Sequence, residues 1–305
     1  MAIQYRPWRE GDDLELVQLW GGPESPPAEQ SRALFRPSSD SPWLRCIVAE
    51  DTVDGVAVPV AAGYVFEPKL HNRRLWAYVE VGKDHRRSGI GATLLGMLRH
   101  EAGRSPSGVS TLRAKVVPGS GGAAFAEAAG LREIQRSRIV EVNPGALAVP
   151  NFTDDDGPQL EEAATGSVEL TRAVTEWYNA VHAWDPADMS LGQAQQFLLA
   201  DTAGAGGAVV LRDRPKSAGG KIAAFALSYT QSRTDAPADV LIGYDTTLEP
   251  SEQSAAVASL LAMLVYQYPV QVEVDDCMAA LVEVLDPLLA TGSAEVVAET
   301  RVVSD

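Results

Sequence analysis

The sequence predicts an α/β protein built from two halves of similar design. Short strand-like segments alternate with helical segments whose apolar residues recur every three or four positions. A basic turn with spaced glycines joins one of these strands directly to a helix. The order of the segments then repeats in the second part of the chain, in apolar pattern although not in residue identity.

The first elements are predicted to be a strand, a helix and a strand pair. Residues 3–6 form a short strand-like run, and residues 14–20 carry apolar side chains at helical spacing. Residues 44–49 and 58–66 are rich in apolar side chains and flank the turn-forming segment 51–55. Two such runs around a turn predict a pair of neighbouring strands.

The next elements follow in a regular order. Residues 75–81 form a strand-like run, and residues 90–100 are helical in pattern, with their apolar side chains on one face. A further strand is predicted over 111–117. Residues 122–130 form a short alanine-rich helix that ends at a glycine, and residues 131–142 have strand character.

The turn between the strand at 75–81 and the following helix is the most informative segment. Gly89 and Gly91 lack the Cβ atoms that would keep a ligand away from the main chain. The first turn of a helix has N–H groups without partners, and its dipole favours negative charge. Arg86 and Arg87 add positive charge. The turn predicts a phosphate or pyrophosphate site, although an ordinary strand–turn–helix corner is the alternative that it leaves open.

The run Arg86-x-x-Gly89-x-Gly91, five residues after a strand that ends at Val81, resembles the acetyl-coenzyme A signature of the GNAT family of N-acetyltransferases. The dinucleotide fingerprint differs because it has three glycines, and the phosphate loop differs because it has Lys before Ser or Thr. The order of elements over residues 1 to about 145 matches the family. The resemblance implies a mixed, mostly antiparallel central sheet flanked by helices, and acetyl-coenzyme A as co-substrate.

The resemblance also implies which residues hold the cofactor. The pantetheine arm is expected between residues 75–81 and 111–117, bonded to main-chain groups near Val79 and Val81. The pyrophosphate is expected on the N–H groups of the turn. The expected cofactor-binding residues are Val79, Val81, Arg86, Arg87, Ser88, Gly89, Ile90, Gly91, Ala92 and Phe125.

Two residues of the same strand are the candidate catalytic residues. Glu80 is our candidate general base, because a carboxylate buried in an apolar strand becomes a better proton acceptor. Tyr78 shares its face by strand alternation and is a candidate acid or orienting group. The alternatives are a solvent-facing Glu80 and a Tyr78 that only packs in the core. The family's usual Asn and Tyr are replaced here by Gly119 and Ala126, so the general acid is not the usual one.

The chain is expected to fold as two domains. Residues 1–145 form the cofactor-binding domain, residues 146–167 are a linker rich in Pro and acidic residues, and residues 168–305 form a degenerate second copy. The expected elements of this copy are a strand and helix over 169–184, strands at 208–212, 222–229 and 239–244, a helix at 257–264, and strands at 270–274 and 295–303.

The second copy lacks the glycine turn. Residues 246–256, between its strand and its helix, contain no glycine, and Glu249 and Glu252 stand in place of the arginines. Because carboxylates repel a pyrophosphate, we expect no acetyl-coenzyme A in residues 168–305.

Composition restricts the partners. The net charge of −16 argues against nucleic acid, and no apolar run reaches the ~20 residues of a membrane span. Cys46 and Cys277 fall in different halves, so we expect a cytoplasmic protein without a structural disulfide. The histidines are scattered, and no Cys/His cluster has metal-ligand spacing, so no metal is expected.

The leading hypothesis is an acetyl-coenzyme A-dependent N-acyltransferase, a monomer or homodimer. It would move an acetyl group to a primary amine of a small molecule by direct attack in a ternary complex. The alternative is a non-catalytic acetyl-coenzyme A-binding or regulatory module that acts through a protein partner. A fortuitous turn in an unrelated α/β protein is a third hypothesis, which the order of elements disfavours.

Overall fold

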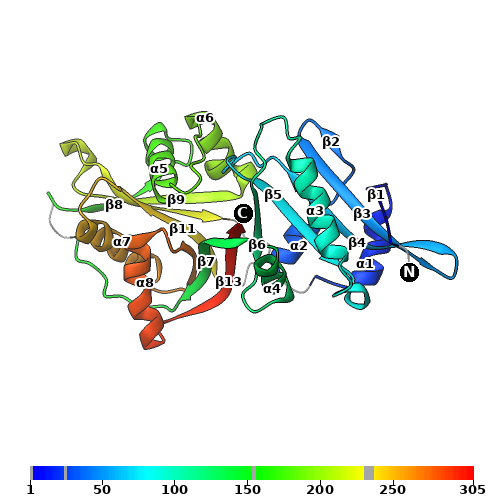
Figure 1. The fold of residues 1–305 in the computed structure, drawn as a ribbon. Coiled ribbons are helices and arrows are strands. Elements are labelled where there is room, and N and C mark those ends of the chain that lie inside the picture. Colours follow the sequence, from blue (N-terminus) through cyan, green and yellow to red (C-terminus); the bar gives the residue numbers. More distant parts are fainter. Residues whose placement is uncertain (1–2, 24–25, 153–155, 230–236) are drawn as a thin grey trace. The chain divides into compact units, whose positions relative to one another are not determined.

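The computed structural model describes residues 3–23, 26–152, 156–229 and 237–305 (Figure 1). The chain forms two compact units, one made of residues 1–134 with 302–305 and the other of residues 135–301. Each unit is a mixed, mostly antiparallel sheet with helices, as the fold prediction requires. Among the described residues, no helix combines the length and the apolar character needed to cross a membrane.

Unit 1 has the strand order β1-β3-β4-β5-β6, with β2 beside β3 and the last residues of β13 beside β6. Strands β1, β2, β3, β4 and β5 pair antiparallel with their neighbours, whereas β5 and β6 pair in parallel. The strands are β1 (Gln4–Pro7), β2 (Ser39–Asp40), β3 (Trp43–Val53), β4 (Val56–Phe66), β5 (Leu75–Val81) and β6 (Leu112–Val116). The helices are α1 (Asp12–Trp20), α2 (Pro26–Arg32), the short 3-10 helix η1 (Lys83–His85), α3 (Ile90–Ala102) and α4 (Gly121–Ala128).

The two faces of the unit 1 sheet carry separate apolar clusters. On one face, α3 buries its apolar stripe, including Leu94 and Leu98, against β3, β4 and β5. On the other, α1 packs Leu16 and Trp20 beside Tyr64. Strand β5 lies between the two clusters, so its alternate side chains enter different environments.

Unit 2 has the strand order β13-β7-β12-β11-β10-β9-β8, and β11 with β12 is its parallel pair. The strands are β7 (Arg132–Val142), β8 (Gln159–Ala163), β9 (Ala205–Arg212), β10 (Ile222–Tyr229), β11 (Ala238–Tyr244), β12 (Val270–Asp275) and β13 (Ala294–Ser304). The longer helices are α5 (Val168–Val181), α7 (Pro250–Leu264) and α8 (Ala279–Thr291), and α6 (Leu191–Ala194) is a single turn. Short 3-10 or π segments follow at η2 (Gln195–Leu199), η3 (Asp201–Ala203) and η4 (Lys216–Ala218).

The compact units do not coincide with the two consecutive domains expected from the sequence, the first of which ends at residue 145. Residues 137–142 of β7 pair with β12 inside unit 2. The chain then returns to unit 1 at its end, where Asp305 accepts hydrogen bonds from Arg99 and from the Leu112 N–H. Sheet pairing, which joins segments distant in sequence, therefore decides to which unit each closing strand belongs.

The expected linker contains a strand. Within residues 146–167, β8 pairs antiparallel with β9, and Glu161 there bonds Arg212 at 2.8 Å. Arg212 is buried and also bonds Glu169, the second residue of α5. The strand expected at the start of 169–184 is therefore displaced to β8, and α5 begins at Val168 with Ser167 as its N-cap.

Gly243 provides a test of the unit 2 core. It lies opposite Phe225 in the β10–β11 pair, and a Cβ at Gly243 would come within 2.2 Å of the Phe225 ring. That ring is buried and meets Trp177 edge to face.

We expect Gly243→Ala to destabilise the protein by about 1–3 kcal/mol through overpacking, measured by urea unfolding. Gly192→Ala, where a Cβ meets nothing within 4 Å, is the control; equal effects of the two changes would contradict this packing argument.

Candidate active site

A cavity of about 600 Å³ lies in unit 1 where β5 and β6 diverge. The two strands pair at Leu75 with Leu112 and at Trp76 with Arg113, and their register goes no further. Residues 77–81 of β5 and 112–117 around β6 then form opposite walls. The divergence leaves main-chain groups of β5 facing the cavity instead of a neighbouring strand, so they are available to a ligand.

The turn after β5 closes one end of the cavity. Gly89 is the N-cap of α3 and has φ 85°, a left-handed conformation that glycine adopts without strain. Arg87 has φ 65° and is one of the non-glycine residues in that region. Arg86 turns back, and its Nε donates to the Val81 carbonyl at 3.0 Å. Ser88 does not line the cavity, because its hydroxyl donates to the His85 carbonyl.

The first turn of α3 faces the cavity with its smallest residues. Gly91 and Ala92 line the cavity, whereas Ile90 is buried in the core beneath the helix. A Cβ at Gly91 would lie 3.5 Å from the Phe125 ring and 3.6 Å from Val81. The N–H groups of a first helical turn have no acceptor within the helix, so this end of the cavity combines N–H donors with the cations of Arg86 and Arg87.

The catalytic candidates on β5 belong to the face opposite α3. Val79 and Val81 pack with the α3 cluster, whereas Tyr78 packs with Tyr64 and Phe35 on the α1 face. All four residues from Tyr78 to Val81 line the cavity. A ligand between the diverging strands therefore contacts both faces of β5.

Glu80 is held by two partners. Arg32 of α2 donates to both carboxylate oxygens, at 2.9 Å and 2.5 Å, and the Tyr78 hydroxyl donates at 2.8 Å. The side chains of Arg32 and Glu80 are each 11 % exposed. Burial and the Glu80 charge raise the pKa of Tyr78 far above its usual range, so the phenol stays protonated. Arg32 and Tyr78 thus orient the Glu80 carboxylate. One of the alternatives was a Glu80 that faces solvent, and the structure differs from it.

Arg32 was not among the residues singled out from the sequence. It also donates to the Gly21 carbonyl at 2.6 Å, and its guanidinium lies 5.3 Å from the centre of the Trp20 ring. A lone arginine after a Pro-rich loop carries no pattern that links it to a strand 48 residues later. Only the fold of α2 against β5 brings Arg32 and Glu80 together.

His85 also lines the cavity and pairs with the buried Asp51, with Nε2 3.5 Å from a carboxylate oxygen. Its Nδ1 is buried and has no hydrogen-bond partner in the described part of the chain. The α4 position where the resemblance expects a Tyr is Ala126, which is buried beside Leu131 and lines the cavity. No hydroxyl stands there.

The corresponding turn of unit 2 is built differently. Between β11 and α7 the chain forms a turn in which Asp245 accepts the Thr247 N–H. The Glu252 carboxylate accepts the Glu249 N–H at 3.1 Å, and Glu249 is the N-cap of α7. The protein's own carboxylates therefore lie at this helix N-terminus, in the place where a bound anion would lie.

Neither the protein-family models nor the curated proteins give a match to this chain. Solved structures do. A GCN5-related N-acetyltransferase from Sphaerobacter thermophilus is similar over 99 % of this chain and 95 % of its own, with TM-score 0.63 and 13 % identity. A tandem GNAT protein from the clavulanic acid biosynthesis pathway is similar over 100 % and 98 %, with TM-score 0.57 and 17 % identity.

A conserved protein from Enterococcus faecalis, described as a probable N-acyltransferase, is similar over 100 % of this chain and 72 % of its own, with TM-score 0.55 and 10 % identity. The similarity extends along the full chain, so both halves take part in it. The chain therefore has the GNAT fold that the resemblance led us to expect, and its similarity to a tandem GNAT protein is consistent with the repeated order of segments in the sequence.

The Arg32–Glu80 pair is testable by a double-mutant cycle. Arg32→Met leaves a buried carboxylate without its cation, and Glu80→Gln leaves the cation without its carboxylate. Each change is expected to destabilise unit 1 by about 3–5 kcal/mol. The double variant should cost clearly less than the sum, since neither charge remains unpaired. Urea unfolding measures all four proteins, and additive effects would show that the two side chains do not act as a pair.

Proposed function

We propose that the protein is an acetyl-coenzyme A-dependent N-acetyltransferase that acylates a primary amine of a small molecule within unit 1. The observation that carries the proposal is the cavity between the diverging β5 and β6, closed at one end by the Gly89–Gly91 turn. The GNAT fold of the solved relatives supports the same reaction class.

The lining of the cavity fits coenzyme A. The apolar side chains of Val79, Val81 and Phe125 suit the pantetheine arm, and the unpaired edge of β5 supplies main-chain groups for its amides. The pyrophosphate suits the N–H groups from Gly89 to Ala92 together with Arg86 and Arg87. Gly91 has no Cβ, so the space beside its main chain, next to the Phe125 ring, is open to a ligand.

The reaction needs an acceptor amine that has lost its proton. Glu80 would take that proton, directly or through water, while Arg32 and Tyr78 hold its carboxylate in place. The amine nitrogen then bonds the thioester carbonyl carbon, and the bond from that carbon to sulfur breaks. The attacking nitrogen loses its second proton to solvent, and the leaving thiolate would take a proton from solvent. The pKa of Tyr78 is raised far above its usual range, so Tyr78 keeps its proton and serves to orient Glu80.

The charge in the cavity also favours an acceptor amine that has lost its proton. Four cationic side chains line the cavity together with the Glu80 carboxylate. They are Arg86, Arg87, Arg113 and Lys115. A positive surrounding disfavours an ammonium ion relative to the neutral amine. The cavity therefore promotes the nucleophilic form of the acceptor, although the chain as a whole is acidic.

The alternative is a non-catalytic module that binds acetyl-coenzyme A and acts through a protein partner. One observation favours it: Ala126 offers no hydroxyl at the α4 position. Such a module would bind the cofactor with the same cavity residues. It would not turn over any amine.

Cofactor binding is tested by Gly91→Ala. The new methyl group would make ordinary contacts with Phe125 and Val81, so the fold should be retained, but it occupies space at the first turn of α3. We expect at least a tenfold weaker Kd for acetyl-coenzyme A, about 1.4 kcal/mol, by calorimetry. Gly96→Ala, later in the same helix with nothing within 4 Å of its Cβ, should bind as the wild type does. Two cofactors per chain, or equal binding by both variants, would contradict the assignment.

The catalytic assignment is tested by Glu80→Gln with an amine library and a pH–rate profile. Loss of a general base lowers kcat/KM by about 10²–10⁴-fold. The part of the pH–rate profile that reports the ionisation of the base should disappear. Circular dichroism would check that the variant is folded. Glu29→Gln, a carboxylate of α2 that does not line the cavity, is the matched control.

The outcomes separate the hypotheses. Full activity in Glu80→Gln with a large loss in His85→Gln would assign the role of general base to His85 instead. Binding of acetyl-coenzyme A without turnover of any amine by the wild type would favour the non-catalytic module.

A further inference from the structure

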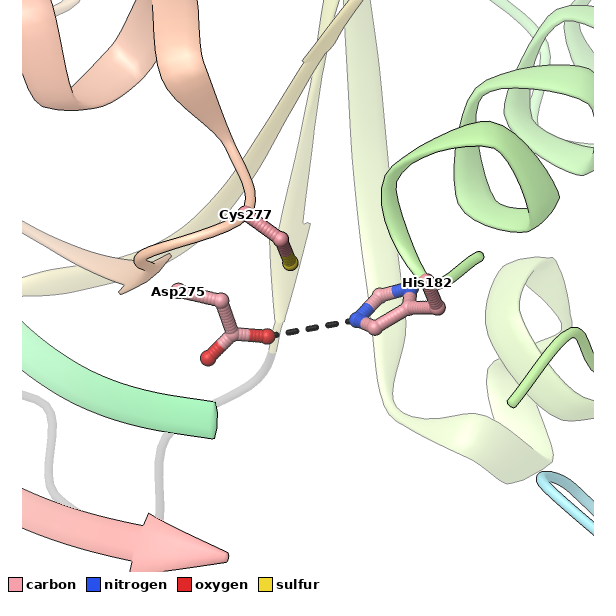
Figure 2. A group of neighbouring side chains, drawn as sticks. All are labelled: His182, Asp275 and Cys277. Carbon is pink, nitrogen blue, oxygen red and sulfur yellow. Dashed lines mark hydrogen bonds and ion pairs between the residues drawn. The ribbon is translucent and has the colours of Figure 1, made fainter. Parts of the chain in front are cut away.

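Unit 2 contains a cluster of three potential metal ligands that is separate from the unit 1 cavity. His182 caps the C-terminus of α5, Asp275 ends β12, and Cys277 lies between β12 and α8 (Figure 2). One ligand atom from each residue lies within 4.8 Å of the other two. The Cys277 sulfur points toward the imidazole and the carboxylate, and His182 and Asp275 are buried.

The hydrogen bonds of His182 prepare its ring for a cation. Its Nδ1 lies 2.9 Å from the Tyr178 carbonyl oxygen, which can only accept, so Nδ1 carries a proton. In the neutral ring, Nε2 then directs its lone pair at a carboxylate oxygen of Asp275, 3.2 Å away. Two lone pairs repel at this distance unless a cation lies between them. That cation is either a second proton on the ring or a metal ion.

The carboxylate is fixed from its other side. The Ser137 hydroxyl donates to the second oxygen of Asp275, and the Gln135 amide donates to Ser137 at 3.2 Å. Both residues belong to β7 and are buried. Hydrogen bonds of this kind, one from the far ring nitrogen of a His and one to the free carboxylate oxygen, orient metal ligands in proteins.

The cluster does not have the arrangement of a Cys nucleophile activated by a His. Such a site needs one ring nitrogen on the thiol and the other on the carboxylate. Here Nδ1 is engaged by the Tyr178 carbonyl, and Nε2 faces Asp275. The Asp275 carboxylate lies near the sulfur, and Asp276 is the adjacent residue, so the negative charge of the cluster is suited to a cation.

We propose that His182 Nε2, Asp275 and the Cys277 sulfur bind one Zn²⁺ ion in unit 2. Nitrogen, oxygen and sulfur ligands together are the set that zinc accepts, and a tetrahedral ion leaves one position for water. The ion would join the end of α5 to the end of β12, which are 93 residues apart between His182 and Asp275. The residues are scattered in the sequence, so their spacing there gave no sign of a metal.

The test uses the full chain without a histidine tag, freed of metal by a chelator and titrated with Zn²⁺ and with Co²⁺. We expect one ion per chain by calorimetry and a thiolate-to-cobalt charge-transfer band in the near ultraviolet. Cys277→Ala should abolish the band, while Cys46→Ala, at the buried cysteine of unit 1, should retain it. Ser137→Ala should weaken the Kd for Zn²⁺ by roughly 10–100-fold.

Alkylation of the wild type, followed by peptide mapping, tests the same site without any substitution. Zn²⁺ should slow the modification of Cys277 and leave that of Cys46 unchanged. No binding by the wild type, or a band that survives in Cys277→Ala, would overturn the proposal and leave His182 and Asp275 as a buried structural pair. Because unit 1 is not involved, these readouts are independent of acetyl transfer.

Discussion

The divergence of β5 from β6 is the constraint on which the candidate site depends. A parallel pair that stayed in register would satisfy its own main-chain groups and leave no space between the strands. Here pairing stops at Trp76 and Arg113, so the edge of β5 faces a cavity. The α3 N-terminus lies at the end of that cavity because Gly89, in a left-handed conformation, lets the chain enter the helix after η1.

The two units have a parallel strand pair in common but carry different side chains around it. In unit 2 the parallel pair also ends early, at Val240 with Val272, while β11 and β12 continue. Carboxylates occupy the following helix N-terminus, where Glu252 bonds the Glu249 N–H. Beyond the end of the pairing, β12 carries Asp275 of the His182 cluster. The main chain opens in both units, and the side chains decide whether an anion or a cation is favoured.

The Arg32–Glu80 pair connects stability to the site. A buried carboxylate is tolerated because a guanidinium and a phenol satisfy its oxygens, and the same contacts fix its direction. Loss of one partner therefore affects folding and geometry together. The proposed site thus depends on α2, a helix of seven residues, as much as on the strand that carries Glu80.

The sequence determined features that arise from local order: most of the strands and helices, although not α2 or α8, the turn at Gly89, and the repeated order of segments. Strand β8, the assignment of residues 135–142 of β7 to unit 2 and of residues 302–305 to unit 1, and the partners of Glu80 arise from contacts between distant residues. The same holds for His182 and Asp275, which come together only through packing. Periodicity and turn chemistry act over a few residues, whereas pairing across a sheet depends on the whole fold. Only the tertiary structure could therefore decide these features.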